Sequence, residues 1–261
     1  ADDDMNSNSN SNSNDDNQAA VTVRKYHRIG DLVAASQKFI KDLKAHRKND
    51  NNNQATNNNN NPRFFNDEAY QLLENYLNMS RRYKTVEVAR RGHEFFLQIE
   101  NELTLSRPYY DLVLNSYAAC CGREKAVTAK AAKHFLLDHM IPAAVTNPSA
   151  RPTSKSFNIA IYCWAKPSYH NGNHAMQLLK RMQEYHNESW QQSISNYDDN
   201  SSNDADDPTI GSMPNARSIT GVIEALDDPS KLLSLLDEMN NKASTVRLDS
   251  IVFSTAIRAV S

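Results

Sequence analysis

The sequence has few glycines, and this scarcity argues against a phosphate-binding loop. Only 6 of its 261 residues are glycine, and they form no Gly-rich phosphate-binding pattern. No apolar run reaches the roughly 20 residues that a membrane-spanning helix needs, so we expect no membrane partner. No Ser/His/Asp order or nucleophile elbow occurs either. We therefore expect no enzymatic activity, no cofactor and no small-molecule substrate.

Cysteine is also scarce, with three residues at Cys120, Cys121 and Cys163. Their count is odd and their spacing fits neither a disulfide framework nor a metal site, so we expect buried helix residues in a reducing compartment. His170 and His174 form a His-x3-His pattern in a polar turn without a third ligand. We therefore predict no metal site.

Apolar residues are under-represented, because three tracts consist largely of Asn, Ser and Asp. These tracts cover residues 1–20, 49–61 and 190–213. Such runs bury too little apolar area to offset chain entropy, so we predict that they are disordered. The first and third tracts hold 10 of the 31 acidic residues and no basic ones, which leaves 29 basic against 21 acidic residues elsewhere. The foldable part is thus basic and suits a polyanionic partner.

One short pattern recurs along the chain: an aromatic or apolar lead residue, followed four places later by an aliphatic one. The pairs are Tyr110 with Leu114, Phe157 with Ile161, Ile219 with Ile223, and Phe253 with Ile257, and a weaker copy starts at Ala69. Pro108, Pro152 and Pro214 precede three of the leads by five or fewer residues. Because proline stops a preceding helix from continuing, each copy is predicted to begin a new helix.

A second apolar stripe follows these first helices, with residues at i, i+3, i+4 and i+7 on one helical face. It reads AMQLLKRM from Ala175, LLSLLDEM from Leu232, GHEFFLQI from Gly92, KHFLLDHM from Lys133 and SQKFIKDL from Ser36. The repeated unit is therefore a pair of helices. The spacing of the units is measured from the residue directly after each lead, and these residues are Tyr70, Asp111, Asn158, Thr220 and Ser254. The spacings between successive ones are 41, 47, 62 and 34 residues. Removing the roughly 28 residues from 186 to 213 brings the longest spacing to about 34, a normal period for a helix-pair repeat.

These observations predict an all-α chain: an α-solenoid of antiparallel helix pairs with disordered Asn/Asp/Ser-rich insertions. Its parts are a disordered tail at 1–20, an isolated or capping helix at 29–47, an Asn-rich linker at 48–62 and a helical repeat array at 63–261. The expected units are 67–106, 107–153, 154–215 with an insertion at 187–213, 216–249, and a truncated unit at 250–261.

The segments PTSKSFNIAIYCWAK…AMQLLKRM, PNARSITGVIEAL…LLSLLDEM and LDSIVFSTAIRA resemble pentatricopeptide repeats. The resemblance covers residues 109–261, and residues 67–105 more weakly. It implies that each unit presents its first helix on a concave face and reads one base of single-stranded RNA with two or three side chains. It also implies a role in RNA processing, stability or translation in a mitochondrion or chloroplast.

In that family the residue after the lead and the last residue of the same unit select the base. The resemblance therefore implies three pairs and one further residue: Asn158 with Asn215, Thr220 with Asp249, Asp111 with Thr153, and Ser254. The first pair resembles a pyrimidine-preferring combination and the second a guanine-preferring one, while Asp111 with Thr153, and Tyr70, depart from the family's pattern. An Asn amide both donates and accepts, a Thr hydroxyl does either, and an Asp carboxylate accepts only. In the alternative interpretation, Asn158 is a helix-start residue that makes a local cap.

Two other functions compete with RNA binding. The irregular spacing and the departures at Tyr70 and Asp111 favour a solenoid that binds another protein. In the third hypothesis the repeats are the recognition arm of an enzyme whose catalytic domain follows Ser261.

Overall fold

The structure is a computed structural model, and it describes residues 26–52, 62–121, 125–165, 172–195, 212–226, 228–241 and 249–260. Throughout these residues the secondary structure is helical and no strand occurs, which confirms the all-α prediction. The elements are α1 (Ile29–Asn52), α2 (Pro62–Tyr83), α3 (Val86–Glu100), α4 (Arg107–Cys120), α5 (Lys125–His134), the π-helix η1 (Phe135–Met140), α6 (Ile141–Thr146), the 3-10 turn η2 (Pro148–Ala150), α7 (Ser154–Trp164), α8 (Gly172–Ser195), α9 (Ala216–Ala225), α10 (Pro229–Asn241) and α11 (Ser250–Val260).

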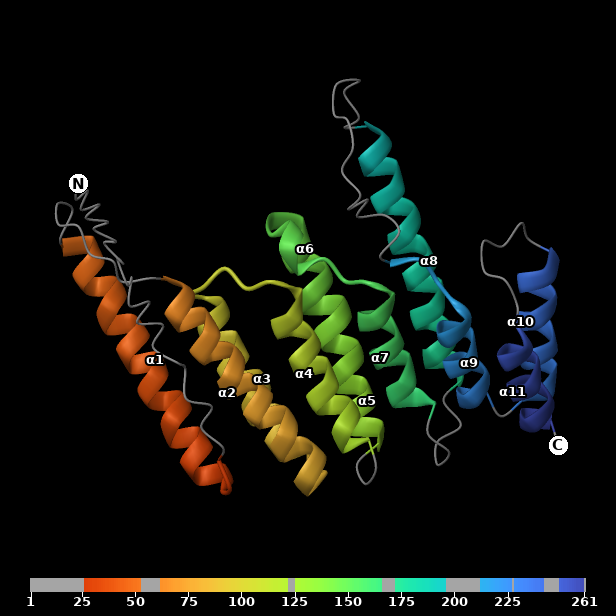
Figure 1. Ribbon diagram of the computed structural model, residues 1–261. Coiled ribbons are helices and arrows are strands. Elements are labelled where there is room, and N and C mark those ends of the chain that lie inside the picture. The colour runs from red at the N-terminus through yellow and green to blue at the C-terminus, as the bar shows by residue number, and fades with distance from the viewer. Residues whose placement is uncertain are drawn as a thin grey trace, which may run out of the picture.

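The helices lie side by side in chain order, from α1 at one end of the molecule to α10 and α11 at the other (Figure 1). Consecutive helices pack together in α2 with α3, α4 with α5, and α7 with α8. A second set of contacts joins helices that are not consecutive in the chain: α2 packs against α4, α4 against α7, α7 against α9, and α9 against α11. We call α2, α4, α7, α9 and α11 the first helices. They form a continuous row that crosses most of the molecule.

Proline and capping residues set where three of the first helices begin. α7 and α9 follow Pro152 and Pro214, and their N-caps are Thr153 and Asn215. The Asn215 Oδ1 accepts the backbone N–H of Ser218 at 3.1 Å, which satisfies one of the donors that a helix start leaves unpaired. In α4, Pro108 lies within the first turn, where its missing N–H costs nothing.

The apolar stripes form the core, as the sequence predicts. The second stripe of α8 is fully covered, with Ala175, Leu178, Leu179 and Met182 all buried. The lead residues Tyr110, Phe157 and Ile219 are buried as well, and so are the aliphatic residues four places after them. Cys120, Cys121 and Cys163 are also buried, and no disulfide joins them. Burying these side chains is the main source of stability, at about 1.5–3 kcal/mol for each large one.

A wider turn interrupts the helix that runs from α5 to α6. Residues Phe135–Met140 form the π-helix η1, and Pro142, which has no N–H to donate, follows it within α6. Here Phe135 is buried against His93 of α3, whose ring centroid lies 4.8 Å away. The His93 Nδ1 lies 2.8 Å from the Tyr117 hydroxyl oxygen of α4. Burial, followed by the nearby His139, lowers the pKa of His93 to about 4, so this imidazole is neutral near pH 7.

Helices of the structure overlap two segments that the sequence predicts to lie between helices. The helix expected at 29–47 continues through Asn52, and α2 already begins at Pro62, so both helices overlap the linker predicted at 48–62. Likewise α8 continues to Ser195, beyond the start of the insertion predicted at 187–213. Once a helix has formed, each added residue gains a hydrogen bond, so polar residues can extend it. The remainder of these tracts, and residues 1–20, lie outside the described residues.

The N-terminal helix α1 is packed rather than isolated. It contacts both α2 and α3, and its stripe of Ser36, Phe39, Ile40 and Leu43 is buried. Among the described helices, none combines the length and apolar character needed to cross a membrane.

We expect Gly221→Ala to destabilise the fold, because Gly221 of α9 lies close to Ile161 of α7. A Cβ atom built there would lie 2.9 Å from the Ile161 Cγ2, and Ile161 is buried. Overpacking costs about 1–3 kcal/mol, against a gain of about 1 kcal/mol in helix propensity. Urea denaturation followed by circular dichroism measures the change. Gly30→Ala is the control, because a Cβ there meets nothing within 4 Å. Equal effects of the two substitutions would contradict the close approach.

Candidate nucleic-acid interface

The candidate base-reading residues share one register. The N-caps Ser106, Thr153 and Asn215 precede α4, α7 and α9, and Asp249 precedes α11. Counting five residues onward from each gives Asp111, Asn158, Thr220 and Ser254, which we call the fifth-position residues. Because successive first helices touch, the N-cap of each can approach the fifth-position residue of the helix before it.

At the first of these sites, the fifth-position side chain is enclosed. Asp111 is buried, and its Oδ1 accepts a hydrogen bond of 2.7 Å from the Ser156 hydroxyl of α7. The Lys155 ammonium lies 3.8 Å from the other carboxylate oxygen. Ser156 also accepts the backbone N–H of Thr153 at 3.3 Å, so its hydroxyl joins both members of the predicted pair. Asp111 therefore lies in the interface between α4 and α7 and not on an open face.

At the second site, the two predicted partners meet directly. The Asn158 Nδ2 donates to the Asn215 Oδ1 at 3.3 Å, in an exposed contact between α7 and α9. Asn215 meanwhile caps α9 through the same oxygen. The Asn158 Oδ1 has no hydrogen-bond partner, although it is shielded from solvent. Asn158 lies at the fifth helical position and makes no cap of its own; Asn215 is the capping residue.

At the third and fourth sites, the fifth-position side chain makes no hydrogen bond to another helix. The Thr220 Oγ1 is shielded from solvent and has no hydrogen-bond partner. Asp249 caps α11, because its Oδ1 accepts the Val252 backbone N–H at 2.9 Å. Ser254 is exposed and its hydroxyl donates to the Ile251 carbonyl oxygen at 3.0 Å. Asp249 therefore caps the next first helix after α9, and no hydrogen bond joins it to the Thr220 hydroxyl.

Ser156 is not among the residues predicted from the sequence, yet its hydroxyl occupies the Asp111 carboxylate. The third residue after the N-cap is Ser156 in α7 and Ser218 in α9, which reads as a capping pattern in the sequence. Only the structure shows that the Ser156 hydroxyl donates to Asp111 of the preceding first helix. The Ser218 hydroxyl instead faces Asn215 Oδ1 at 3.3 Å and the Met182 sulfur of α8 at 3.7 Å.

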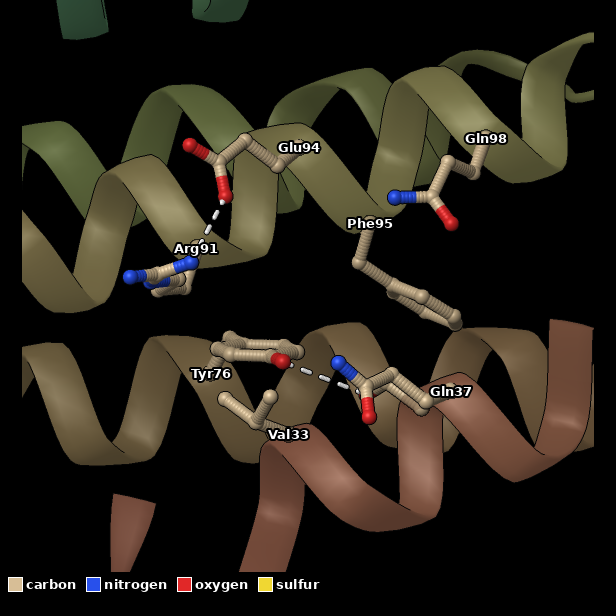
Figure 2. A pocket seen from close by; sticks show the side chains of 8 residues that line it. Val33, Gln37, Tyr76, Arg91, Glu94, Phe95 and Gln98 are labelled. Carbon is tan, nitrogen blue, oxygen red and sulfur yellow. Dashed lines mark hydrogen bonds and ion pairs between the residues drawn. The ribbon is translucent and has the colours of Figure 1, made fainter. Parts of the chain in front are cut away.

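A separate pocket lies between α1, α2 and α3 (Figure 2) and encloses about 110 Å³. Phe95 and Val33 form part of its wall, and the amides of Gln37 and Gln98 also line it. Its remaining polar groups are already matched. Arg91 pairs with Glu94 at 3.4 Å, and the Tyr76 hydroxyl accepts a hydrogen bond from the buried Ser36 at 3.2 Å. The pocket therefore offers a ligand few unpaired groups.

Among the described residues, no group of three or more His, Cys, Asp or Glu side chains is arranged to hold a metal ion. Of the predicted His-x3-His pair, His170 lies outside these residues. The His174 ring packs on Trp164 with the ring centroids 4.4 Å apart.

We expect Asp111→Asn to stabilise the protein near pH 7. Burial raises the pKa of the Asp111 carboxyl above its ordinary value of 3.8, and it outweighs the opposing effects of Ser156 and Lys155. A carboxyl whose pKa is raised on folding destabilises the native state while ionised, and this penalty vanishes below the ordinary pKa. The amide keeps an acceptor for Ser156 without the charge. Urea midpoints should therefore rise at about pH 7 and coincide with wild type at about pH 3.

The exposed Asp42 supplies the control, since Asp42→Asn should leave both midpoints unchanged. A lower midpoint for Asp111→Asn at neutral pH would mean that the ionised carboxylate contributes net stability through its contacts with Ser156 and Lys155.

Comparisons of the chain with protein-family models, with curated proteins and with solved structures find no match. The repeat frame and the candidate interface therefore rest on the residues of this chain and on their contacts.

Proposed function

We propose that the protein is an α-solenoid of helix pairs that binds single-stranded RNA, with the first helices forming the recognition surface. Asn158 with Asn215, and Thr220 with Asp249, read bases in this proposal. Its role is RNA processing, stability or translation in a mitochondrion or chloroplast, as the resemblance to pentatricopeptide repeats implies. The protein itself supplies binding and no catalytic group.

One observation carries the proposal: two successive fifth-position residues have unmet hydrogen-bonding capacity. The Asn158 Oδ1 and the Thr220 Oγ1 both lack a partner, in the same register of α7 and α9. Leaving such a group unpaired away from water costs about 1–3 kcal/mol, so its presence calls for an explanation. A ligand that supplies the missing partners removes this cost. Both residues are only half-buried, and we expect side-chain rotation to present them to a ligand.

Single-stranded RNA fits these groups because its unstacked bases expose donors and acceptors on their edges. An asparagine amide can donate and accept at the same base edge, and a threonine hydroxyl can do either. The basic balance of the chain outside its acidic tracts provides the sequence-independent attraction to phosphate. Asp111 is not part of the proposed surface, because Ser156 already occupies its carboxylate.

We expect Asn158→Ala and Thr220→Ala to change base preference more than overall affinity. Filter binding to a random single-stranded RNA library, followed by sequencing of the retained RNA, measures the preference at each position. Losing a hydrogen-bonded base contact should reduce discrimination at that position by about 1–3 kcal/mol while phosphate contacts persist.

Asn78→Ala is the matched control, because Asn78 is an exposed asparagine on α2 outside the fifth-position register. Its preference should equal that of wild type. If wild-type protein enriches no RNA and shows no salt-sensitive retention, the proposed function is wrong.

A second function has a specific observation in its favour. Three large apolar residues of α11 are exposed, namely Ile251, Phe253 and Ile257 at 62%, 50% and 66%. The equivalents of Phe253 and Ile257 in α7 and α9 are buried. An exposed apolar face of this kind favours contact with another protein. This alternative predicts a protein partner that co-purifies with the chain. The Phe253→Ser substitution should abolish its binding, and ribonuclease treatment should leave it bound.

A further inference from the structure

A basic residue precedes the fifth-position residue by about one helical turn on three consecutive first helices. Arg107 lies four residues before Asp111, Lys155 three before Asn158, and Arg217 three before Thr220. Residues three or four apart share one face of a helix. All three cations are exposed. On α11 the corresponding residue is Ile251, so the pattern ends there.

Among the described residues, these three cations make no ion pair within their own helix, in contrast to four basic residues of α3 and α8. On α3 and α8, Arg90, Arg91, Lys180 and Arg181 all pair with glutamates of their own helix. The first turns of α4, α7 and α9 contain no acidic residue.

Arg217 makes no ion pair or hydrogen bond with any described residue. Lys155 approaches only the buried Asp111, and at 3.8 Å its side chain remains 71% exposed. The Arg217 guanidinium is therefore available to an external anion, and the Lys155 ammonium remains largely exposed beside its ion pair with Asp111.

The contacts between helices align the cations with the fifth-position residues. The approach of Lys155 to Asp111 places the first turn of α7 beside the fifth position of α4. The hydrogen bond between Asn158 and Asn215 places the start of α9 beside the fifth position of α7. The basic and polar residues thus form two adjacent rows across α4, α7 and α9.

We propose that Lys155 and Arg217, with Arg107 at the edge of the row, bind the backbone phosphates of the RNA whose bases the fifth-position residues read. This inference rests on the proposed function, and it names the residues that hold the strand. Ammonium and guanidinium groups form charge-assisted hydrogen bonds with phosphate oxygens, and arginine does so in a bidentate geometry. Contacts of this kind fix the register of a strand and carry no sequence information themselves.

The test compares the salt dependence of RNA binding by Lys155→Gln, Arg217→Gln and the double variant of the full chain. Dissociation constants are measured between about 50 and 200 mM salt, for the RNA that wild type selects and for one that it disfavours. Each lost phosphate contact should lower the slope of log K against log salt by about 0.7, and the double variant by about 1.4. Binding of both RNAs should weaken by the same factor.

Lys180→Gln is the matched control, because Lys180 is similarly exposed but lies on α8, outside the row. It should keep the wild-type slope. Circular dichroism checks that the variants are folded, which the exposure of both side chains leads us to expect.

Two results would overturn the inference while the proposed function stands. In the first, wild type binds RNA and both variants keep its salt slope. In the second, a variant binds one RNA more weakly at an unchanged slope, which would mean that the side chain contacts a base. Absence of RNA binding by wild type would instead remove the proposed function, and this inference with it.

Discussion

The close packing of successive first helices is the constraint on which the rest of the structure depends. Gly221 lets α9 approach the buried Ile161 of α7, and the same row of contacts joins α4 to α7 and α9 to α11. This packing buries the lead and aliphatic residues of α4, α7 and α9. It also places the N-cap of one helix beside the fifth-position residue of the helix before it. Core formation and the candidate interface are therefore two results of one helix arrangement.

That arrangement gives equivalent fifth-position residues different chemical environments. Asp111 meets the Ser156 hydroxyl and becomes part of a helix interface, whereas Asn158 meets Asn215 and keeps an unpaired oxygen. The cations Lys155 and Arg217 lie on the same helix faces, where no acidic residue of the first turn neutralises them. A surface with unpaired polar groups beside exposed positive charge is chemically suited to a strand that offers both base edges and phosphates.

Much of the fold could be predicted from the sequence, because helix starts and apolar faces are local properties. The prolines and N-caps before α7 and α9 mark their first residues, and the stripe from Ala175 to Met182 is buried as its spacing predicts. The ends of α1 and α8 could not be predicted in the same way. Asparagine and serine are poor helix formers, yet a helix already docked against its neighbours extends into them.

The sequence by itself determined the helices, their buried faces and the register that relates Asp111, Asn158, Thr220 and Ser254. Only the tertiary structure decided which of these side chains is already satisfied. The reason is that the partners of Asp111 and Asn158 come from the following first helix, dozens of residues away along the chain. Whether that helix supplies the hydroxyl of Ser156 or the amide of Asn215 depends on how the two helices pack, and no local pattern encodes it.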